Sequence, residues 1–268
     1  MSLQEVYPKI RPAIFALVPK YTHPSHKGGL PPVLGTGFFV REDGLAMTNA
    51  HVIEAFREVF RPEDAPEKDW PVQGLFFVRK DEEILAMRVD VLAVIGLGSF
   101  LMNFPGRSSA PDVGLVQMDV SSVPFLSLNP QTELQEGMEV ATAGFPSGRR
   151  ALESPGGLQL GPTLQRGIVS ALLPFPGPRP QAFSVNIMTH GGASGSPVFD
   201  PRNGSLLGIL FSSLQDVGSL DQGRDTYAMP TTITYALPSS YLLRVMEMAP
   251  SVLRSTPSFD QRITGIKT

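Results

Sequence analysis

A glycine-rich loop around position 194 holds the chain's best candidate nucleophile. The segment His190–Phe199 has three glycines and two serines ahead of an apolar run. Glycines let the backbone turn sharply and let a substrate carbonyl approach closely. The backbone N–H groups of such a turn, here at Gly192 and Ser194, can stabilise an oxyanion. The loop predicts nucleophilic attack on a carbonyl, although a flexible Gly/Ser loop entering a strand has the same composition.

A serine hydroxyl needs a base to act as a nucleophile, and the chain offers four histidines. His51 follows the apolar segment Gly44–Thr48, where a strand would end and a helical turn begin, so we expect its imidazole at a strand tip. His190 shares the nucleophile's loop and would need an unusual fold-back. His23 and His26 have no other obvious ligand nearby, which is weak support for a metal site. His51 is therefore the predicted base.

A carboxylate that fixes the imidazole tautomer would complete the set. Asp112 directly precedes the apolar run Val113–Met118, which places it at the mouth of an expected strand. A turn-capping role after Pro111 would explain the same residue type. The other carboxylates that we considered are less well placed: Asp43, Asp90 and Asp119.

The chain order of His51, Asp112 and Ser194 is that of chymotrypsin among the convergent triads. An α/β-hydrolase needs a histidine after the nucleophile, and none follows Ser194. Its nucleophile motif also needs a glycine where this chain has Ser196. A subtilisin order could use Asp43, but that fold needs alternating strands and long helices, which the sequence lacks.

Short apolar runs must form the elements that position these residues. They are rich in Val, Ile, Phe and Thr and are separated by Gly, Pro, Asn, Asp or Ser, which is typical of a β-barrel or sandwich. Asp43-Gly44 and Asn203-Gly204 each separate two such runs, which predicts tight hairpins. Helices are expected at Val52–Phe60 and Pro238–Met248. The expected surface loops are 61–71, 99–111, 146–163, 174–181 and 214–226.

The composition argues against several other classes of protein. With 42% hydrophobic and 18% charged residues, the 268-residue chain is typical of a globular protein. Its 22 basic and 25 acidic residues form no basic stripe, so no nucleic-acid partner is expected. It has no cysteine, and we expect neither a cofactor nor a metal. No apolar stretch suits a membrane span. The absence of a signal-peptide pattern favours the cytoplasm, or the envelope if the natural chain has a longer N-terminus.

Several segments together resemble the trypsin-like serine peptidases of the HtrA/Deg type. They are Gly35–Val40 with Thr48–Ile53, Asp112–Val116, Ala143–Pro146 with Gln165–Ser170, Gly192–Pro197, and Thr234–Ser239. No PDZ domain is expected, because about 20 residues follow the last expected helix and such a domain needs roughly 80–100.

The resemblance implies an all-β fold of two six-stranded antiparallel β-barrels of chymotrypsin type with a C-terminal helix. His51 and Asp112 would belong to the first barrel and Ser194 to the second. The implied division is 1–122 for the N-terminal barrel, 123–133 for a linker, 134–237 for the C-terminal barrel, and 238–268 for the helix and tail.

The resemblance also implies a serine endopeptidase that cleaves polypeptides through an acyl-enzyme on Ser194. The N–H groups of Gly192 and Ser194 would form the oxyanion hole. The strand Leu207–Ser213 would offer its edge to an extended substrate. The predicted substrate contacts are Met188, Thr189, Leu210, Phe211 and Ser212.

The loop around Ser194 departs from the common family sequence at two positions. Ala193 and Ser196 replace the Asn and the second Gly of the common family loop, which is tolerable because the oxyanion donors are backbone groups.

No acidic residue stands at Met188 or Thr189, so we expect a P1 preference for small or medium apolar residues rather than Lys or Arg. The alternative function is a catalytically silent peptide-binding module. No oligomeric state is predicted.

Overall fold

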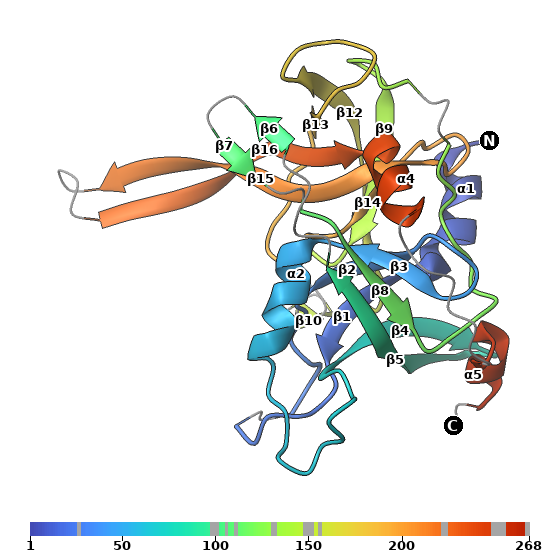
Figure 1. The fold of residues 1–268 in the computed structure, drawn as a ribbon. Coiled ribbons are helices and arrows are strands. Elements are labelled where there is room, and N and C mark those ends of the chain that lie inside the picture. Colours follow the sequence, from blue (N-terminus) through green and yellow to red (C-terminus); the bar gives the residue numbers. More distant parts are fainter. Residues whose placement is uncertain are drawn as a thin grey trace.

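Two closed β-barrels make up most of the protein. The structure is a computed structural model that describes residues 1–25, 28–96, 102–104, 107–109, 112–129, 133–146, 153–154, 157–220, 225–247 and 256–265. The barrels are antiparallel and six-stranded, with strand orders β1-β2-β3-β8-β5-β4 and β12-β13-β16-β15-β14-β9. In Figure 1 the first barrel lies below the second. The predicted all-β fold of two six-stranded barrels is confirmed.

The first barrel closes around a cluster of aromatic rings. The ring centroid of Phe15 lies 5.1 Å from that of Phe39 and 4.8 Å from that of Phe76. Phe15 and Phe39 are fully buried, and burying such a side chain stabilises a fold by about 1.5–3 kcal/mol. The strands are β1 (Ile14–Pro19), β2 (Gly35–Phe39), β3 (Leu45–Thr48), β4 (Val72–Lys80), β5 (Glu83–Gly96) and β8 (Gly114–Met118).

The second barrel carries a long hairpin arm that the sequence did not predict. The expected loop 214–226 instead continues β15 and β16, whose pairing runs out to Leu220 opposite Asp225. The arm projects to the left in Figure 1. Cross-strand hydrogen bonds pair the two segments with each other, so a polar, glycine-containing stretch can stay extended. The strands are β9 (Glu139–Gly144), β12 (Thr163–Leu173), β13 (Ala182–Val185), β14 (Pro197–Phe199), β15 (Leu206–Leu220) and β16 (Asp225–Pro238).

Both predicted hairpins are present. Strand β2 pairs with β3, with Phe38 opposite Met47, and β14 pairs with β15, with Val198 opposite Gly208. Gly44 and Gly204 in the connecting turns have φ values of 85° and 79°. The short two-stranded sheets are β6 (Met102–Phe104) with β7 (Arg107–Ser109), and β10 (Glu153–Ser154) with β11 (Gly157–Leu158).

The helices are short and lie on the surface of the barrels. The helix expected at 52–60 begins earlier, at Ala50, because Asn49 has the extended backbone of an N-cap. The helix expected at 238–248 is confirmed, and the sequence did not predict those near the two ends. The helical segments are α1 (Leu3–Ile10), η1 (Arg11–Ala13), α2 (Ala50–Glu54), η2 (Ala55–Glu58), α4 (Ser239–Glu247) and α5 (Phe259–Gly265). No helix in the described ranges is long and apolar enough to cross a membrane.

The segment between the barrels is hydrogen-bonded to both of them. The N–H of Leu126 donates to the carbonyl of Phe39 in the first barrel at 3.0 Å, and the N–H of Leu206 in the second donates to the carbonyl of Ser127 at 2.9 Å. Helix α1 adds a bond from the Tyr7 hydroxyl to the carbonyl of Pro162. These contacts fix how the two barrels face each other.

Candidate active site

Asp112 and His51 form a two-point contact at one end of the first barrel. Pairing of β3 with β8 sets Thr48 opposite Gly114, which brings the residues after Thr48 close to those before Gly114. The carboxylate of Asp112 accepts from the Nδ1 of His51 at 2.6 Å and from its backbone N–H at 3.0 Å. A proton on Nδ1 leaves Nε2 as the basic atom of the ring. The predicted pairing of these residues is therefore present in the structure.

Asn49 adds a further hydrogen bond between the segment of His51 and that of Asp112. Its Nδ2 donates to the backbone carbonyl of Asp112 at 2.6 Å, and Asn49 is itself fully buried. Asn49 and His51 thus both connect the start of α2 by hydrogen bonds to Asp112, which lies just before β8. The sequence analysis did not single out Asn49, although it lies two positions before His51.

The environment of His51 makes its ring a stronger base. The hydrogen bond to Asp112 raises the pKa of His51 above the ordinary 6.5, because the carboxylate favours the protonated ring. Partial burial acts in the opposite direction, while the charges of Asp112 and Glu54 add to the increase. About half of the side chain, 47%, is exposed, so the ring is accessible from solvent.

The three competing aspartates all have other partners. Asp43 pairs with Arg41 at 2.7 Å, Asp90 with Lys20 at 3.0 Å and Asp119 with Arg262 at 2.6 Å. None of these pairs includes His51, so among these four aspartates Asp112 alone contacts the candidate base.

Two tight turns shape the nucleophile loop. The N–H of Ala193 donates to the carbonyl of His190, and that of Ser196 donates to the carbonyl of Ala193. Gly195 has a φ of +85°, and a Cβ there would lie 2.2 Å from the carbonyl oxygen of Thr36, so only glycine fits. The loop is thereby fixed against the first barrel.

These turns leave the two predicted oxyanion donors available. Gly192 has a φ of +94°, in the left-handed region, and its N–H has no backbone acceptor in the described part of the chain. The N–H of Ser194 likewise has none among the described residues. Donors that are not used inside the protein are a requirement for an oxyanion hole.

Gly35 is the contact point between the loop of Ser194 and the helix of His51. A Cβ at Gly35 would lie 2.7 Å from Cγ2 of Val52, the neighbour of His51, and 3.2 Å from the carbonyl oxygen of Ser194. The described hydrogen bonds do not include one between Ser194 Oγ and the His51 ring. Such bonds are often long before substrate binds and shorten in the complex.

A hollow of about 450 Å³ lies beside Ser194. The predicted contacts Thr189, Leu210, Phe211 and Ser212 all line it, whereas Met188 is not among its lining residues and is 41% exposed. Other lining residues are His190, Gly191, Ala193, Ser213 and Thr234.

Thr234 is a pocket residue that the sequence analysis missed. Its Oγ1 lies 3.0 Å from that of Thr189 and donates to the carbonyl of Ile187 at 2.6 Å. Because that carbonyl can only accept, the shared bond must run from the Thr189 hydroxyl to Thr234. Pairing with Ser213 of β15 on one side and Val185 of β13 on the other places this residue, and no local sequence signal indicates that it reaches the pocket.

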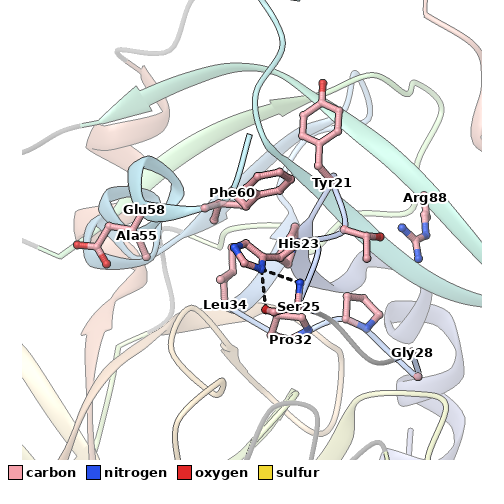
Figure 2. A pocket seen from close by; sticks show the side chains of 15 residues that line it. Tyr21, His23, Ser25, Gly28, Pro32, Leu34, Ala55, Glu58, Phe60 and Arg88 are labelled. Carbon is pink, nitrogen blue, oxygen red and sulfur yellow. Dashed lines mark hydrogen bonds between the residues drawn. The ribbon is translucent and has the colours of Figure 1, made fainter. Parts of the chain in front are cut away.

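A larger hollow, about 800 Å³, lies on the first barrel and contains none of the candidate catalytic residues. Figure 2 shows His23 in this hollow, where Nδ1 is hydrogen-bonded to Ser25. His26 lies outside the described residues. Within the described ranges, no cluster of three His, Cys, Asp or Glu side chains could hold a metal.

Ser196 fits at its position because residue 144 is glycine. A Cβ at Gly144 would lie 1.9 Å from Ser196 Oγ and 2.9 Å from Thr36 Oγ1. The Ser196 hydroxyl is buried and has no hydrogen-bond partner among the described residues. The serine that replaces the common family glycine therefore occupies space that Gly144 leaves empty.

We expect Gly144→Ala to lower the free energy of unfolding by about 1–3 kcal/mol, as is usual for overpacking. In a Ser196→Gly background the same change should cost less, because the closest clashing atom is gone. Urea denaturation of the wild type, both single variants and the double variant measures this coupling. Equal costs of Gly144→Ala in both backgrounds would contradict the steric account.

The two barrels, with the loop of Ser194 on one and the His51–Asp112 pair on the other, define a chymotrypsin-like fold. The solved HtrA-type protease AlgW with decapeptide superposes with a TM-score of 0.54 and 18% identity, covering 92% of this chain and 67% of that one. The serine endoprotease from Yersinia pestis superposes with a TM-score of 0.52 and 18% identity, covering 92% and 66%. These likenesses support the fold.

The chain belongs to the trypsin-like peptidase domain family, which it matches over residues 35–209. It is 27% identical to a probable periplasmic serine endoprotease DegP-like of Halomonas elongata, over 66% of this chain and 28% of that protein. It is 31% identical to the peroxisomal leader peptide-processing protease of Homo sapiens, over 42% of this chain and 19% of that protein. The chain thus spans less than a third of these relatives. The predicted resemblance to the HtrA/Deg type is confirmed.

Proposed function

We propose that the protein is a serine endopeptidase in which Ser194 is the nucleophile, His51 the general base and Asp112 the residue that orients the base. The observation that carries this proposal is the two-point contact between Asp112 and His51. It gives the imidazole one tautomer and one orientation, which general-base catalysis needs. Membership in the trypsin-like peptidase family supports the same assignment.

The proposed reaction proceeds in two acyl-transfer steps. Nε2 of His51 takes the proton of Ser194 Oγ as that oxygen attacks the peptide carbonyl. The N–H groups of Gly192 and Ser194 bind the oxyanion of the tetrahedral intermediate. The protonated His51 then donates to the leaving amine, and the C–N bond breaks. A water molecule, deprotonated by His51, releases the acyl group and restores Ser194.

The substrate is a polypeptide that binds in an extended form. The pocket residues Leu210–Ser213 are consecutive on β15, and the described β14 pairs with β15 only up to Ile209. The backbone of Leu210 is hydrogen-bonded to Gly195 and Ser196, so a substrate strand can pair with the edge from Phe211 onward. One similar structure, that of the HtrA-type protease AlgW, is of the protein with a decapeptide, which is consistent with peptide binding in this fold.

Digestion of an unfolded protein distinguishes the enzyme from the silent peptide-binding module. The wild type should convert casein into peptides with new N-termini, and Ser194→Ala should leave it intact. A wild type that binds casein in a pull-down but leaves it uncut, under all conditions of pH and temperature tried, would favour the binding module.

The same digestion tests the proposed P1 preference. The described residues that line the pocket beside Ser194 are threonines, serines, glycine, alanine, leucine, phenylalanine and His190, and among them His190 alone has a titratable side chain. We expect the cleavage sites, identified by mass spectrometry, to follow small or medium uncharged residues. Preferential cleavage after Lys or Arg would contradict this expectation.

The location also remains a proposal. We propose a reducing compartment such as the cytoplasm, which fits the lack of cysteine, while the relatives are named for the periplasm and the peroxisome.

A further inference from the structure

Thr36 lies in the first barrel, and its N–H and hydroxyl groups donate hydrogen bonds to the second barrel. It is fully buried, and it follows Gly35 at the start of β2. Its N–H donates to the carbonyl of Ser194 at 2.8 Å. Its Oγ1 donates to the carbonyl of Gly192 at 2.9 Å. One residue thus binds the carbonyls of both proposed oxyanion donors.

The proton positions in this network follow from the atom types. The carbonyl of Gly192 can only accept, so the Thr36 hydroxyl must donate to it. The oxygen of the Thr36 hydroxyl also accepts a hydrogen bond from the N–H of Phe145 at 3.1 Å. A hydroxyl donates once, so its single proton is committed to the nucleophile loop. A buried network with its donors and acceptors satisfied in this way resists reorientation.

The first barrel in turn fixes Thr36. Its carbonyl accepts from Thr48 Oγ1 at 2.8 Å, and Thr48 is also fully buried. Strand β3 ends at Thr48, three residues before His51 in helix α2. The loop of the proposed oxyanion donors is therefore linked through Thr36 to the strand that precedes the helix of the base.

The orientation of two peptide units depends on these bonds. The Gly192 carbonyl belongs to the peptide that precedes the Ala193 N–H, and a glycine with a φ of +94° can readily adopt other backbone conformations. If that peptide turned over, its oxygen could point toward the cleft and repel an oxyanion. The hydrogen bond from the Thr36 hydroxyl opposes this rotation, because it holds the Gly192 carbonyl oxygen on the side that faces the first barrel.

We propose that Thr36 is a positioning residue for the oxyanion hole: it holds the peptide units that follow Gly192 and Ser194 against the first barrel. These units border the ones that carry the two proposed N–H donors, so the turn that presents the donors keeps its conformation. This inference rests on the proposed peptidase function. It assigns a role in transition-state stabilisation to a residue that contacts neither the substrate nor the reacting atoms.

Two substitutions at position 36 test the proposal. Thr36→Val keeps the shape of the side chain and removes the hydroxyl, whereas Thr36→Ser keeps the hydroxyl. Loss of one oxyanion donor costs enzymes about 10²–10³ in kcat, so a displaced donor in Thr36→Val should lower kcat by about 10- to 100-fold. KM for a short peptide should change by less than about threefold, because the ground state gains little from the hole.

The design must separate this role from a purely structural one. Thr36→Val also leaves the buried N–H of Phe145 without its acceptor, so stability will fall. Active-site titration with a fluorophosphonate therefore normalises kcat to folded, reactive enzyme. Thr142→Val is the matched control, because Thr142 is a buried β9 residue whose hydroxyl has no partner among the described residues. Its kcat should equal that of the wild type.

A peptide boronic acid provides a second measurement, since its adduct on Ser194 places an oxygen in the hole. Its affinity should fall in Thr36→Val by about the same factor as kcat and recover in Thr36→Ser. A kcat per titrated site within about twofold of wild type, with unchanged boronate affinity, would overturn the proposal.

A crystal structure of Thr36→Val decides the inference even if the wild type cleaves no peptide and the proposed function fails. A Gly192 carbonyl turned toward the cleft, or a nucleophile loop with several conformations, supports the positioning role. A loop that superposes on the wild-type loop overturns it.

Discussion

Peptide hydrolysis is expected to fall by about 10⁶-fold in kcat when Ser194 is replaced by alanine, the size of effect seen when a triad serine is removed. The reason is that no other group can form the acyl-enzyme. His51→Ala should cause a loss of similar size, because the serine hydroxyl then has no base. Initial rates with a peptide substrate, chosen from the casein cleavage sites, measure both losses.

The combination of the two substitutions is more informative than either alone. Residues that act as one unit are strongly non-additive, so the double variant Ser194→Ala, His51→Ala should be no slower than the single variants. Thr142→Val, the buried control in the second barrel, should retain wild-type kcat. Multiplying losses, or a Ser194→Ala variant that keeps wild-type activity, would exclude Ser194 and His51 as a joint catalytic unit.

The second large effect is expected from Asp112→Asn, which should lower kcat by about 10⁴-fold. The amide keeps the size of the side chain but can donate a hydrogen bond to Nδ1, which selects the wrong tautomer. Asp90→Asn is the matched control, because Asp90 pairs with Lys20 instead of His51. The control variant should keep wild-type rates.

Asp112 should also set the pH dependence of the reaction. The contact with Asp112 raises the pKa of His51 above 6.5, and only the neutral ring can accept the serine proton. For the wild type, kcat/KM should therefore fall as pH decreases through an inflection above 6.5. In Asp112→Asn the inflection should move to lower pH, because the carboxylate no longer favours the protonated ring. An unchanged inflection would contradict this origin of the pKa shift.

The parts of the fold that follow from local sequence could be predicted. Asp43-Gly44 and Asn203-Gly204 set the hairpins, because glycine supplies the positive φ that those turns need. The strands around them were visible as apolar runs. The pairing of Asp112 with His51 could also be predicted, since chain order and the resemblance restrict which residues meet.

The features that were missed depend on register between distant strands. The hairpin arm of β15 and β16 has polar residues and glycines that read as a loop, and only mutual pairing keeps it extended. Thr234 enters the pocket through its pairing with Ser213. Thr36 contacts the nucleophile loop across the barrel junction, at a sequence separation that no periodicity can report.

Met188 was wrongly predicted to line the pocket, and the reason is local rather than a matter of strand register. It precedes the nucleophile loop and was predicted to line the pocket together with Thr189. Adjacent residues in an extended chain point to opposite sides, and the structure directs Thr189 to the pocket. Proximity in sequence to the nucleophile was therefore insufficient to identify a substrate contact.

Mapping the covalent adduct of a fluorophosphonate probe tests whether the imidazole of His51 activates Ser194. We expect one adduct, on Ser194, when the wild type is labelled, digested and analysed by mass spectrometry. The labelling rate should collapse in His51→Ala, although the hydroxyl of Ser194 is still present. An adduct on another residue, or labelling of Ser194 at the wild-type rate without His51, would contradict activation of that serine by the imidazole.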